Sequence, residues 1–210
     1  MKEEIVDVYD LEGKFLHRQG RTDYYMEVYQ EYRDKGSVST QLRVVKGLIL
    51  NPSGRCYLQL RSKVKTENRG LLDKTVGGHV AHGTSDYIAF ILECQQELGI
   101  PVAVVPNDQF LSTLRSVDLS ILGIVKELEV VNAFYSTRCL PNGEAVVLPQ
   151  IVTFYLGYFN GPIQFQDGEA SGILSFSQKE LLEEFVHRKK AFTEDIVFML
   201  ERFGVELKAL

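Results

Sequence analysis

A pair of adjacent glycines followed by a helical pattern constrains the fold of this chain more than any other feature. Gly77 and Gly78 precede a segment from Ser85 to Leu98 that has helical periodicity, and Gly99 supplies its stop signal. Glycine has no Cβ, so the backbone at this pair can approach a ligand or a metal closely. The segment therefore predicts a loop with a function, followed directly by a helix.

Two acidic residues share one side of this predicted helix. Glu93 and Glu97 are four positions apart, and Gln96 lies on the same side. Carboxylate and amide oxygens of this kind suit a hard cation such as Mg²⁺ or Mn²⁺. We expect the opposite side to pack on a sheet through its apolar residues, which are Ile88, Ile91 and Leu98.

Strand-like and helix-like patterns alternate along the rest of the chain. Strands are expected at residues 4–9, 44–50, 56–61, 130–135 and 150–159, and a turn at 51–54 makes the second and third of these a hairpin. Further helices are expected around 25–32, after the capping-box pattern at 177–180, and from 193 to Gly204. Residues 106–129 fit either a helix or a strand. This mixture indicates an α+β or α/β sandwich.

Composition narrows the class of protein. The chain has 210 residues, 45% of them hydrophobic, which favours one large globular domain. Its net charge of −5 argues against a nucleic-acid partner. We expect no membrane span and no signal peptide, and three cysteines without paired spacing favour a reducing cytoplasm.

The segment from Gly77 to Ile100 resembles the Nudix box, whose pattern is G-x5-E-x7-R-E-U-x-E-E-x-G-U, where U is apolar. Without any gap, Gly78 matches the first glycine, Glu93 and Glu97 match two of the acids, and Gly99-Ile100 match the end. Upstream, the runs at 58–62, 70–73 and 76–80 resemble the branch that includes isopentenyl-diphosphate isomerases and their hydrolase-like relatives.

The box departs from the family pattern at three positions. Thr84 replaces the first glutamate, Leu92 replaces the arginine, and Gln96 replaces the first glutamate of the final pair. Fewer carboxylates attract a divalent ion less strongly, and the missing arginine would normally orient a neighbouring glutamate. The match therefore implies the family fold and leaves two outcomes for catalysis open, namely that it is retained or that it is impaired or redirected.

The resemblance implies a single Nudix domain with an α/β/α sandwich and a mixed β-sheet. We expect a lead-in at about 1–37, a core at about 38–176 and C-terminal helices at about 177–210. It also implies a Mg²⁺ or Mn²⁺ site at Glu93, Glu97 and Gly78, and a catalytic set of Glu93, Gln96 and Glu97. A homodimer is a further expectation from the fold class.

Residues outside the metal set are candidates for binding a diphosphate. A basic cluster before the box includes Arg61, Lys65 and Arg69, whose charges suit phosphate oxygens. His79 lies in the glycine loop, and Glu169 matches by order an acid that sometimes serves in this family. An ordinary solvated loop explains the basic cluster equally well. For Glu169 a role outside the site is the simpler interpretation.

Three functions follow, in order of preference. The first is a metal-dependent hydrolase that cleaves a phosphoanhydride bond in a nucleoside diphosphate derivative or a similar small diphosphate. The second is a catalytically silent Nudix fold that binds a ligand or a protein. The isomerase is disfavoured, because Gly77 stands where its signature has cysteine and because residues 39–45 lack its histidine pair.

Overall fold

A computed structural model describes residues 3–164 and 170–210 of the chain. The strands are β1 (Ile5–Asp10), β2 (Phe15–Gly20), β3 (Thr40–Leu50), β4 (Cys56–Arg61), β5 (Leu72–Asp73), β6 (Val76–His79), β7 (Val102–Val104), β8 (Gly123–Cys139), β9 (Ala145–Tyr158) and β10 (Ala170–Phe176). The helices are α1 (Arg21–Lys35), α2 (Asp86–Leu98), α3 (Phe110–Ser116), α4 (Gln178–Arg188) and α5 (Glu194–Phe203), with single 3₁₀ turns at Lys189–Ala191 and Gly204–Glu206.

Within the described ranges, ten strands form one mixed sheet. Its main path runs β10-β4-β3-β9-β8-β7, while β1, β2, β5 and β6 attach at its sides. Strand β3 runs parallel to β9 and β7 runs parallel to β8, whereas the other neighbours on the path are antiparallel. The expected hairpin is present, because Leu50 pairs with Cys56 across β3 and β4.

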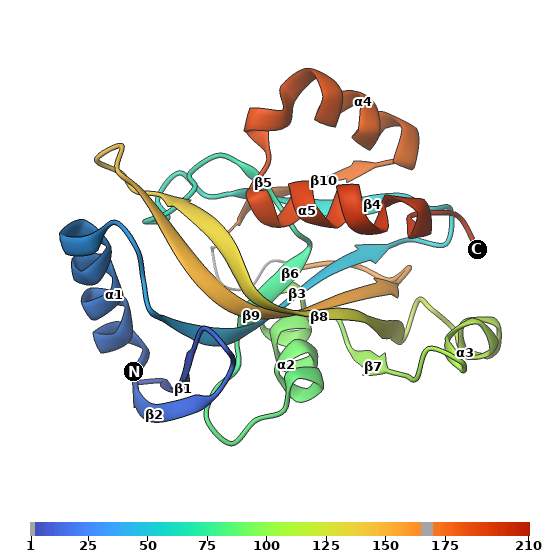
Figure 1. Ribbon diagram of the computed structural model, residues 1–210. Coiled ribbons are helices and arrows are strands. Elements are labelled where there is room, and N and C mark those ends of the chain that lie inside the picture. The colour runs from blue at the N-terminus through green and yellow to red at the C-terminus, as the bar shows by residue number, and fades with distance from the viewer. Residues whose placement is uncertain (1–2, 165–169) are drawn as a thin grey trace.

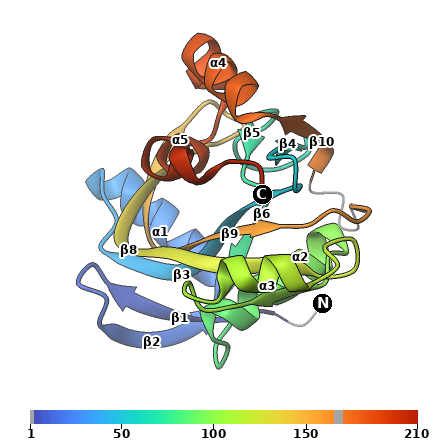
Figure 2. The same cartoon turned by 90° about the vertical axis from the view of Figure 1, so that its right-hand side faces the viewer.

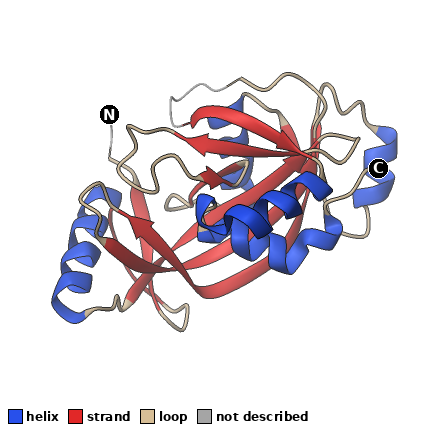
Figure 3. Ribbon diagram, turned by 90° about the horizontal axis from the view of Figure 1, so that it is seen from above, coloured by secondary structure: helices blue, strands red, loops and turns tan. Residues whose placement is uncertain are grey.

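Alternating residues of β3 build the two layers of core. Val45 and Ile49 pack in the cluster that contains α2, whereas Val44 and Leu48 pack in the cluster that contains α3 and α5. Successive side chains of a strand point to opposite faces, so one apolar strand can serve both layers. Helix α2 lies on one side of the sheet and α5 on the other (Figures 1 and 2). The view from above shows helices lying over the strands (Figure 3).

Helix α2 packs on the sheet with Leu98 and the partly buried Ile91, as expected, but not with Ile88. Phe90, Cys94 and Leu98 are buried, at a spacing of four, whereas Ile88 is 39% exposed. Phe90 stacks on Tyr155, with ring centroids 4.3 Å apart. The expectation that Ile88 packs on the sheet was wrong, because the large Phe90 ring sets the rotation of the helix. Gly99 ends α2 with φ of 65°, as expected.

The two C-terminal helices begin where the sequence predicts. The Ser177 hydroxyl accepts from the backbone N–H of Glu180, and the Glu180 carboxylate accepts from the backbone N–H of Ser177. This capping box opens α4. Helix α5 follows Thr193, and its second acid, Asp195, is buried beneath the sheet rather than exposed at the helix start.

The segment at 106–129 contains both kinds of structure, since it holds α3 and the beginning of β8. Strand β8 extends beyond the expected range 130–135 at both ends, whereas β9 begins before the expected range 150–159 and ends at Tyr158. The two strands pair with each other along most of their length. Helix α1 and strand β1 form a separate apolar cluster with β3 and β9. No helix in the described part of the chain has the length and apolar character needed to cross a bilayer.

Candidate active site

A cavity of about 660 Å³ contains most of the residues that the sequence singles out. It lies where β3, β6, β8, α1 and α2 meet the loop that follows β4. Its described lining includes ten charged residues: Glu4, Arg21, Lys46, Arg61, Lys65, Glu67, Lys74, Glu93, Glu97 and Arg138. Cations outnumber anions in this set, so the lining suits an anionic ligand.

The glycine pair provides room for two long side chains in this cavity. A Cβ at Gly78 would overlap the carboxylate of Glu93, and a Cβ at Gly77 would overlap the side chain of Lys74. Gly77 and Gly78 lie in β6, which pairs with β3. The pair therefore lets an acid from α2 and a lysine approach the same stretch of backbone.

The acidic side of α2 faces the cavity. Glu93, Gln96 and Glu97 all line it, as the helical spacing predicts. Glu97 is only 8% exposed, and its carboxylate accepts a hydrogen bond of 2.9 Å from the amide of Gln59. Because a neighbouring amide holds it, the Glu97 carboxylate has a defined orientation.

The donor set fits a divalent ion that arrives with a substrate better than a preformed ion site. Within residues 3–164 and 170–210, no three His, Cys, Asp or Glu side chains gather closely enough to hold an ion. Glu93, Glu97 and the Gln96 carbonyl nevertheless offer hard oxygen donors on one wall. Mg²⁺ is commonly bound by one or two protein carboxylates together with substrate phosphates.

Three buried ion pairs, formed by two lysines and two aspartates, lie beneath the opposite wall. Lys46 in β3 donates to Asp195 of α5 at 2.7 Å and to Gln150 of β9 at 2.7 Å. Lys74 contacts Asp73 at 3.1 Å and Asp195 at 3.5 Å. The side chains of Lys46 and Asp195 are 3% and 2% exposed, so the C-terminal helix supplies a fully buried carboxylate under the site.

Burial and charge act in opposite directions on these groups. Burial lowers the pKa of the Lys46 ammonium to about 8, while Asp195 opposes that shift. Burial alone would raise the pKa of Asp73, but the charges of Lys74 and Arg61 bring it to about 2. For Asp195, the charges of Lys46 and Lys74 likewise outweigh burial and hold the pKa far below its ordinary value. At neutral pH both carboxyl groups are therefore ionised and Lys46 is mostly protonated.

Two arginines complete this wall. Arg61 donates to Asp73 at 2.8 Å and to the backbone carbonyl of Glu67. Arg138 of β8 is 12% exposed, and its Nε lies 3.6 Å from the carboxylate of Glu67. No described group accepts a hydrogen bond from that buried Nε.

Helix α1 reaches the same cavity through Tyr25. The hydroxyl of Tyr25 lies 2.5 Å from Nε2 of His79. Burial, reinforced by the nearby cations Arg21 and Arg138, lowers the pKa of His79 to about 3. Burial also raises the pKa of Tyr25 to about 12. Tyr25 therefore keeps its proton and donates to a neutral His79.

The predicted substrate residues divide into three groups. Arg61, Lys65 and His79 line the cavity. Arg69 does not line it; the Arg69 side chain is exposed and donates to the backbone carbonyl of Lys65. Glu169 lies outside the described residues.

Several lining residues were not predicted from the sequence, above all Lys46 and Arg138. A lysine inside the apolar run of residues 44–50 is a signal that could have identified Lys46, since a buried charge needs a partner. Arg138 lies in an ordinary polar stretch and carries no such signal. Asp195 lies in the first turn of the helix expected from 193, and its buried pairing depends on the tertiary structure.

The departures from the Nudix pattern lie mostly outside the cavity. Thr84 is half-buried in the turn before α2, Leu92 is 46% exposed, and neither lines the cavity. Only Gln96 faces it. The missing glutamate at Gln96 therefore changes the charge of the cavity wall most directly.

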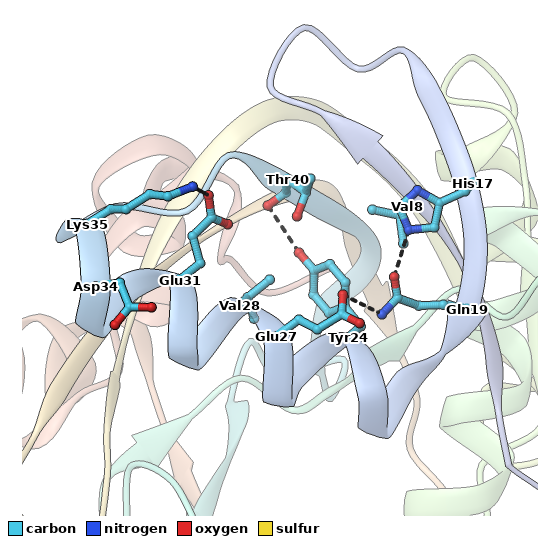
Figure 4. A pocket seen from close by; sticks show the side chains of 10 residues that line it. All are labelled: Val8, His17, Gln19, Tyr24, Glu27, Val28, Glu31, Asp34, Lys35 and Thr40. Carbon is cyan, nitrogen blue, oxygen red and sulfur yellow. Dashed lines mark hydrogen bonds and ion pairs between the residues drawn. The ribbon is translucent and has the colours of Figure 1, made fainter.

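A second cavity, of about 330 Å³, lies between α1 and the β1–β2 hairpin (Figure 4). Its lining includes Tyr24, Glu27 and Glu31 of α1 together with His17 and Gln19 of β2. None of the predicted site residues lines it. The chemistry suggested by the sequence therefore belongs to the larger cavity.

No protein-family model matches the sequence, and no curated protein matches it. Among solved structures, DR0079 from Deinococcus radiodurans aligns over 95% of this chain and 98% of its own, with 18% identity and a TM-score of 0.63. A MutT protein from Methanosarcina mazei Go1 aligns over 79% of this chain and 94% of its own, with 20% identity and a TM-score of 0.50. A Nudix-family hydrolase from Clostridium perfringens aligns over 80% and 95%, with 17% identity and a TM-score of 0.45. The expected α/β/α sandwich with a mixed sheet is confirmed, and the fold of this chain is the Nudix fold.

Proposed function

We propose that this protein is a Nudix-type hydrolase that cleaves a phosphoanhydride bond in a small molecule containing a diphosphate. One observation carries the proposal: the acids of α2 and a set of buried cations line the same cavity. Arginine forks and lysine ammonium groups are the usual protein partners of phosphate oxygens. The Nudix fold of the chain supports the same reaction class.

Each wall contributes a different part of the reaction. Lys46, Lys74 and Arg61 bind and orient the phosphates, which places one phosphorus opposite α2. Water adds to that phosphorus, the bridging P–O bond breaks, and the leaving phosphate keeps the bonding electrons. Glu93 and Glu97 place negative charge near the attacking water, and their carboxylates accept its proton.

We propose Mg²⁺ or Mn²⁺ as the cofactor, with Glu93, Glu97 and the Gln96 carbonyl as the protein groups that hold it. When bound, the ion polarises a phosphoryl oxygen and stabilises charge in the transition state. Gly78 contributes by leaving space for the Glu93 carboxylate. Gln59 contributes by orienting Glu97.

A hydrolysis screen against nucleoside diphosphates and their derivatives, with Mg²⁺ or Mn²⁺, tests the proposal. We expect turnover that depends on the metal and that Glu97→Gln abolishes. The matched control is Glu183→Gln, because Glu183 lies on α4 with 59% of its side chain exposed. Turnover that Glu97→Gln leaves unchanged contradicts the role given to Glu97.

The alternative is a catalytically silent protein that binds the same ligands. The observation in its favour is Gln96, a neutral amide on the cavity wall where the family has a carboxylate. Gln96→Glu alone, and Gln96→Glu combined with Thr84→Glu and Leu92→Arg, discriminate between the two. An inert native protein with an active restored variant supports the silent protein, whereas equal turnover excludes it.

Two further features bear on the choice. No cysteine lines the cavity: Cys56 and Cys94 are buried elsewhere and Cys139 is exposed. This disfavours the isomerase, which needs a cysteine at the reacting carbon skeleton. All three cysteines are free thiols, which supports a cytoplasmic location.

A further inference from the structure

The innermost part of the site cavity, which we call its floor, has more cationic side chains than the neighbouring buried carboxylates can pair with. Four cations gather there with little exposure: the side chains of Lys46, Lys74, Arg138 and Arg61 are 3%, 10%, 12% and 14% exposed. Behind them lie two fully buried carboxylates, Asp73 and Asp195. Both carboxylates are engaged by Lys46, Lys74 and Arg61.

Arg138 is the group that this arrangement leaves short of partners. Its nearest carboxylate is that of Glu67 at 3.6 Å, which is too far for a hydrogen bond, and its buried Nε finds no acceptor among the described residues. Glu67 is already held by the hydroxyl of Tyr29. Buried charged donors are nearly always hydrogen-bonded, so an arginine that lines a cavity and has a buried Nε without an acceptor indicates a place for an anion.

The floor is closed behind these cations. Asp195, Gln150 and Phe134 surround the Lys46 ammonium; Nζ lies 4.9 Å from the centre of the Phe134 ring, and all three residues are less than 9% exposed. By contrast, Arg21 of the same cavity is 47% exposed. A ligand can therefore enter past Arg21 and end at Lys46, but it cannot continue beyond it.

We propose that Lys46, Lys74 and Arg138 form a subsite for a terminal phosphate group, so that the preferred substrate ends in a free phosphate. This inference rests on the proposed function and narrows it. A terminal phosphate brings about two negative charges and three acceptor oxygens, which match several converging donors. A diphosphate that bridges two organic groups carries one charge on each phosphate. Its two groups need open space at both ends of the binding site.

Asp195 acts in this subsite as a positioning residue. It accepts from Lys46, Lys74 and Ser136, and so fixes both ammonium groups without facing the cavity itself. Through Asp195, the C-terminal helix α5 determines where the phosphate is held.

Calorimetric titration of the full-length protein, stripped of divalent metal so that the ligands stay intact, tests the subsite. The probes are inorganic pyrophosphate and four matched pairs: ADP with ADP-ribose, CDP with CDP-choline, GDP with GDP-mannose, and UDP with UDP-glucose. In each pair the second compound is capped, which means that its terminal phosphate carries a further organic group. We expect the free diphosphate of at least one pair to bind at least tenfold more tightly than its capped partner. Equal binding within every pair, tighter binding of the capped forms, or no binding of any probe overturns the proposal.

Substitutions at Arg138 then test whether the bound phosphate contacts the floor of the cavity. Arg138→Gln should weaken the binding of the preferred free diphosphate at least tenfold and the binding of its capped partner less than threefold. For the free diphosphate, the affinity of Arg138→Lys should lie between those of the native protein and Arg138→Gln. Arg33→Gln is the matched control, since Arg33 is exposed and pairs with Glu144 away from the cavity. If Arg138→Gln fails to fold, Lys74→Met is measured in its place with the same expectation. An equal loss for both ligand forms, or no loss, overturns the assignment.

The results separate this inference from the proposed function. Binding that depends on Arg138, without metal-dependent hydrolysis of any probe, leaves the subsite standing and refutes the hydrolase. Hydrolysis of capped diphosphates that depends on Glu97 but not on Arg138 supports the hydrolase and refutes the subsite.

Discussion

Lys46 Nζ lies 2.7 Å from the Asp195 carboxylate, although the two residues are 149 positions apart in the chain. The pair joins the central strand β3 to the last helix, α5, directly beneath the candidate active site. Both side chains are almost completely buried. A contact of this kind links the stability of the fold to the position of the charges that face the ligand.

Removing both members of this pair should destabilise the protein by less than the sum of the two single removals. Lys46→Met leaves Asp195 buried with Lys74 and Ser136 as its remaining partners, and should lower the free energy of unfolding by about 3 kcal/mol. The double variant Lys46→Met/Asp195→Asn should lose less than the sum of the single variants, with a coupling energy of about 1–3 kcal/mol. Urea denaturation of all four proteins measures the cycle. Additive losses would show that the two charges do not depend on each other.

Acid should destabilise the protein through Asp73. In the folded state its pKa is about 2, compared with an ordinary value of 3.8, because Lys74 and Arg61 outweigh its burial. A carboxyl whose folded pKa is lowered stabilises the fold above its unfolded pKa, and this contribution is lost as the pH falls from about 4 to about 2. The loss should be about 2 kcal/mol. Urea unfolding at several pH values should give a shallower decline for Asp73→Asn; parallel curves would rule out this contribution.

Gly78→Ala should impair the site, because a Cβ there overlaps the carboxylate of Glu93. We expect the variant to lose at least tenfold in metal-dependent turnover and to lose the rise in melting temperature that Mn²⁺ gives the native protein. Gly172→Ala in β10 is the control, since a Cβ at that position meets nothing within 4 Å. Unchanged Mn²⁺ stabilisation in Gly78→Ala would argue against Glu93 as a metal ligand.

Tyr25→Phe should destabilise the protein by about 1 kcal/mol, because Nε2 of the half-buried His79 loses its hydrogen-bond donor. Tyr87→Phe is a suitable control, as Tyr87 is 52% exposed and donates no hydrogen bond to a described residue. Thermal unfolding at neutral pH compares the three proteins. If both variants melt together with the native protein, the Tyr25–His79 contact does not contribute to stability.

The acidic half of the candidate site could be predicted from the sequence because it depends on local geometry. Glu93, Gln96 and Glu97 face one cavity because residues three and four apart lie on one side of any α-helix. The rotation of the same helix was harder to predict. Ile88 and Phe90 are both apolar, and which of them packs on the sheet depends on the space above Gly47 and beside Tyr155.

The basic half could be predicted only in part. Arg61 and Lys65 come shortly before the glycine pair in the chain, and both line the cavity. Arg69 belongs to the same cluster in the sequence, yet it does not line the cavity. Charge and proximity along a loop do not determine the direction of each side chain, because a loop has no regular period.

The sequence by itself determined the alternation of strands and helices, the capping of α4, the glycine pair and the spacing of the acids behind it. These features follow from local periodicity and backbone freedom, which act over a few residues. Only the tertiary structure brought Lys46, Arg138 and Asp195 together, from β3, β8 and α5. Their contacts depend on strand order and on the face that α5 covers, and such long-range pairing is decided by the packing of the whole core rather than by any short segment.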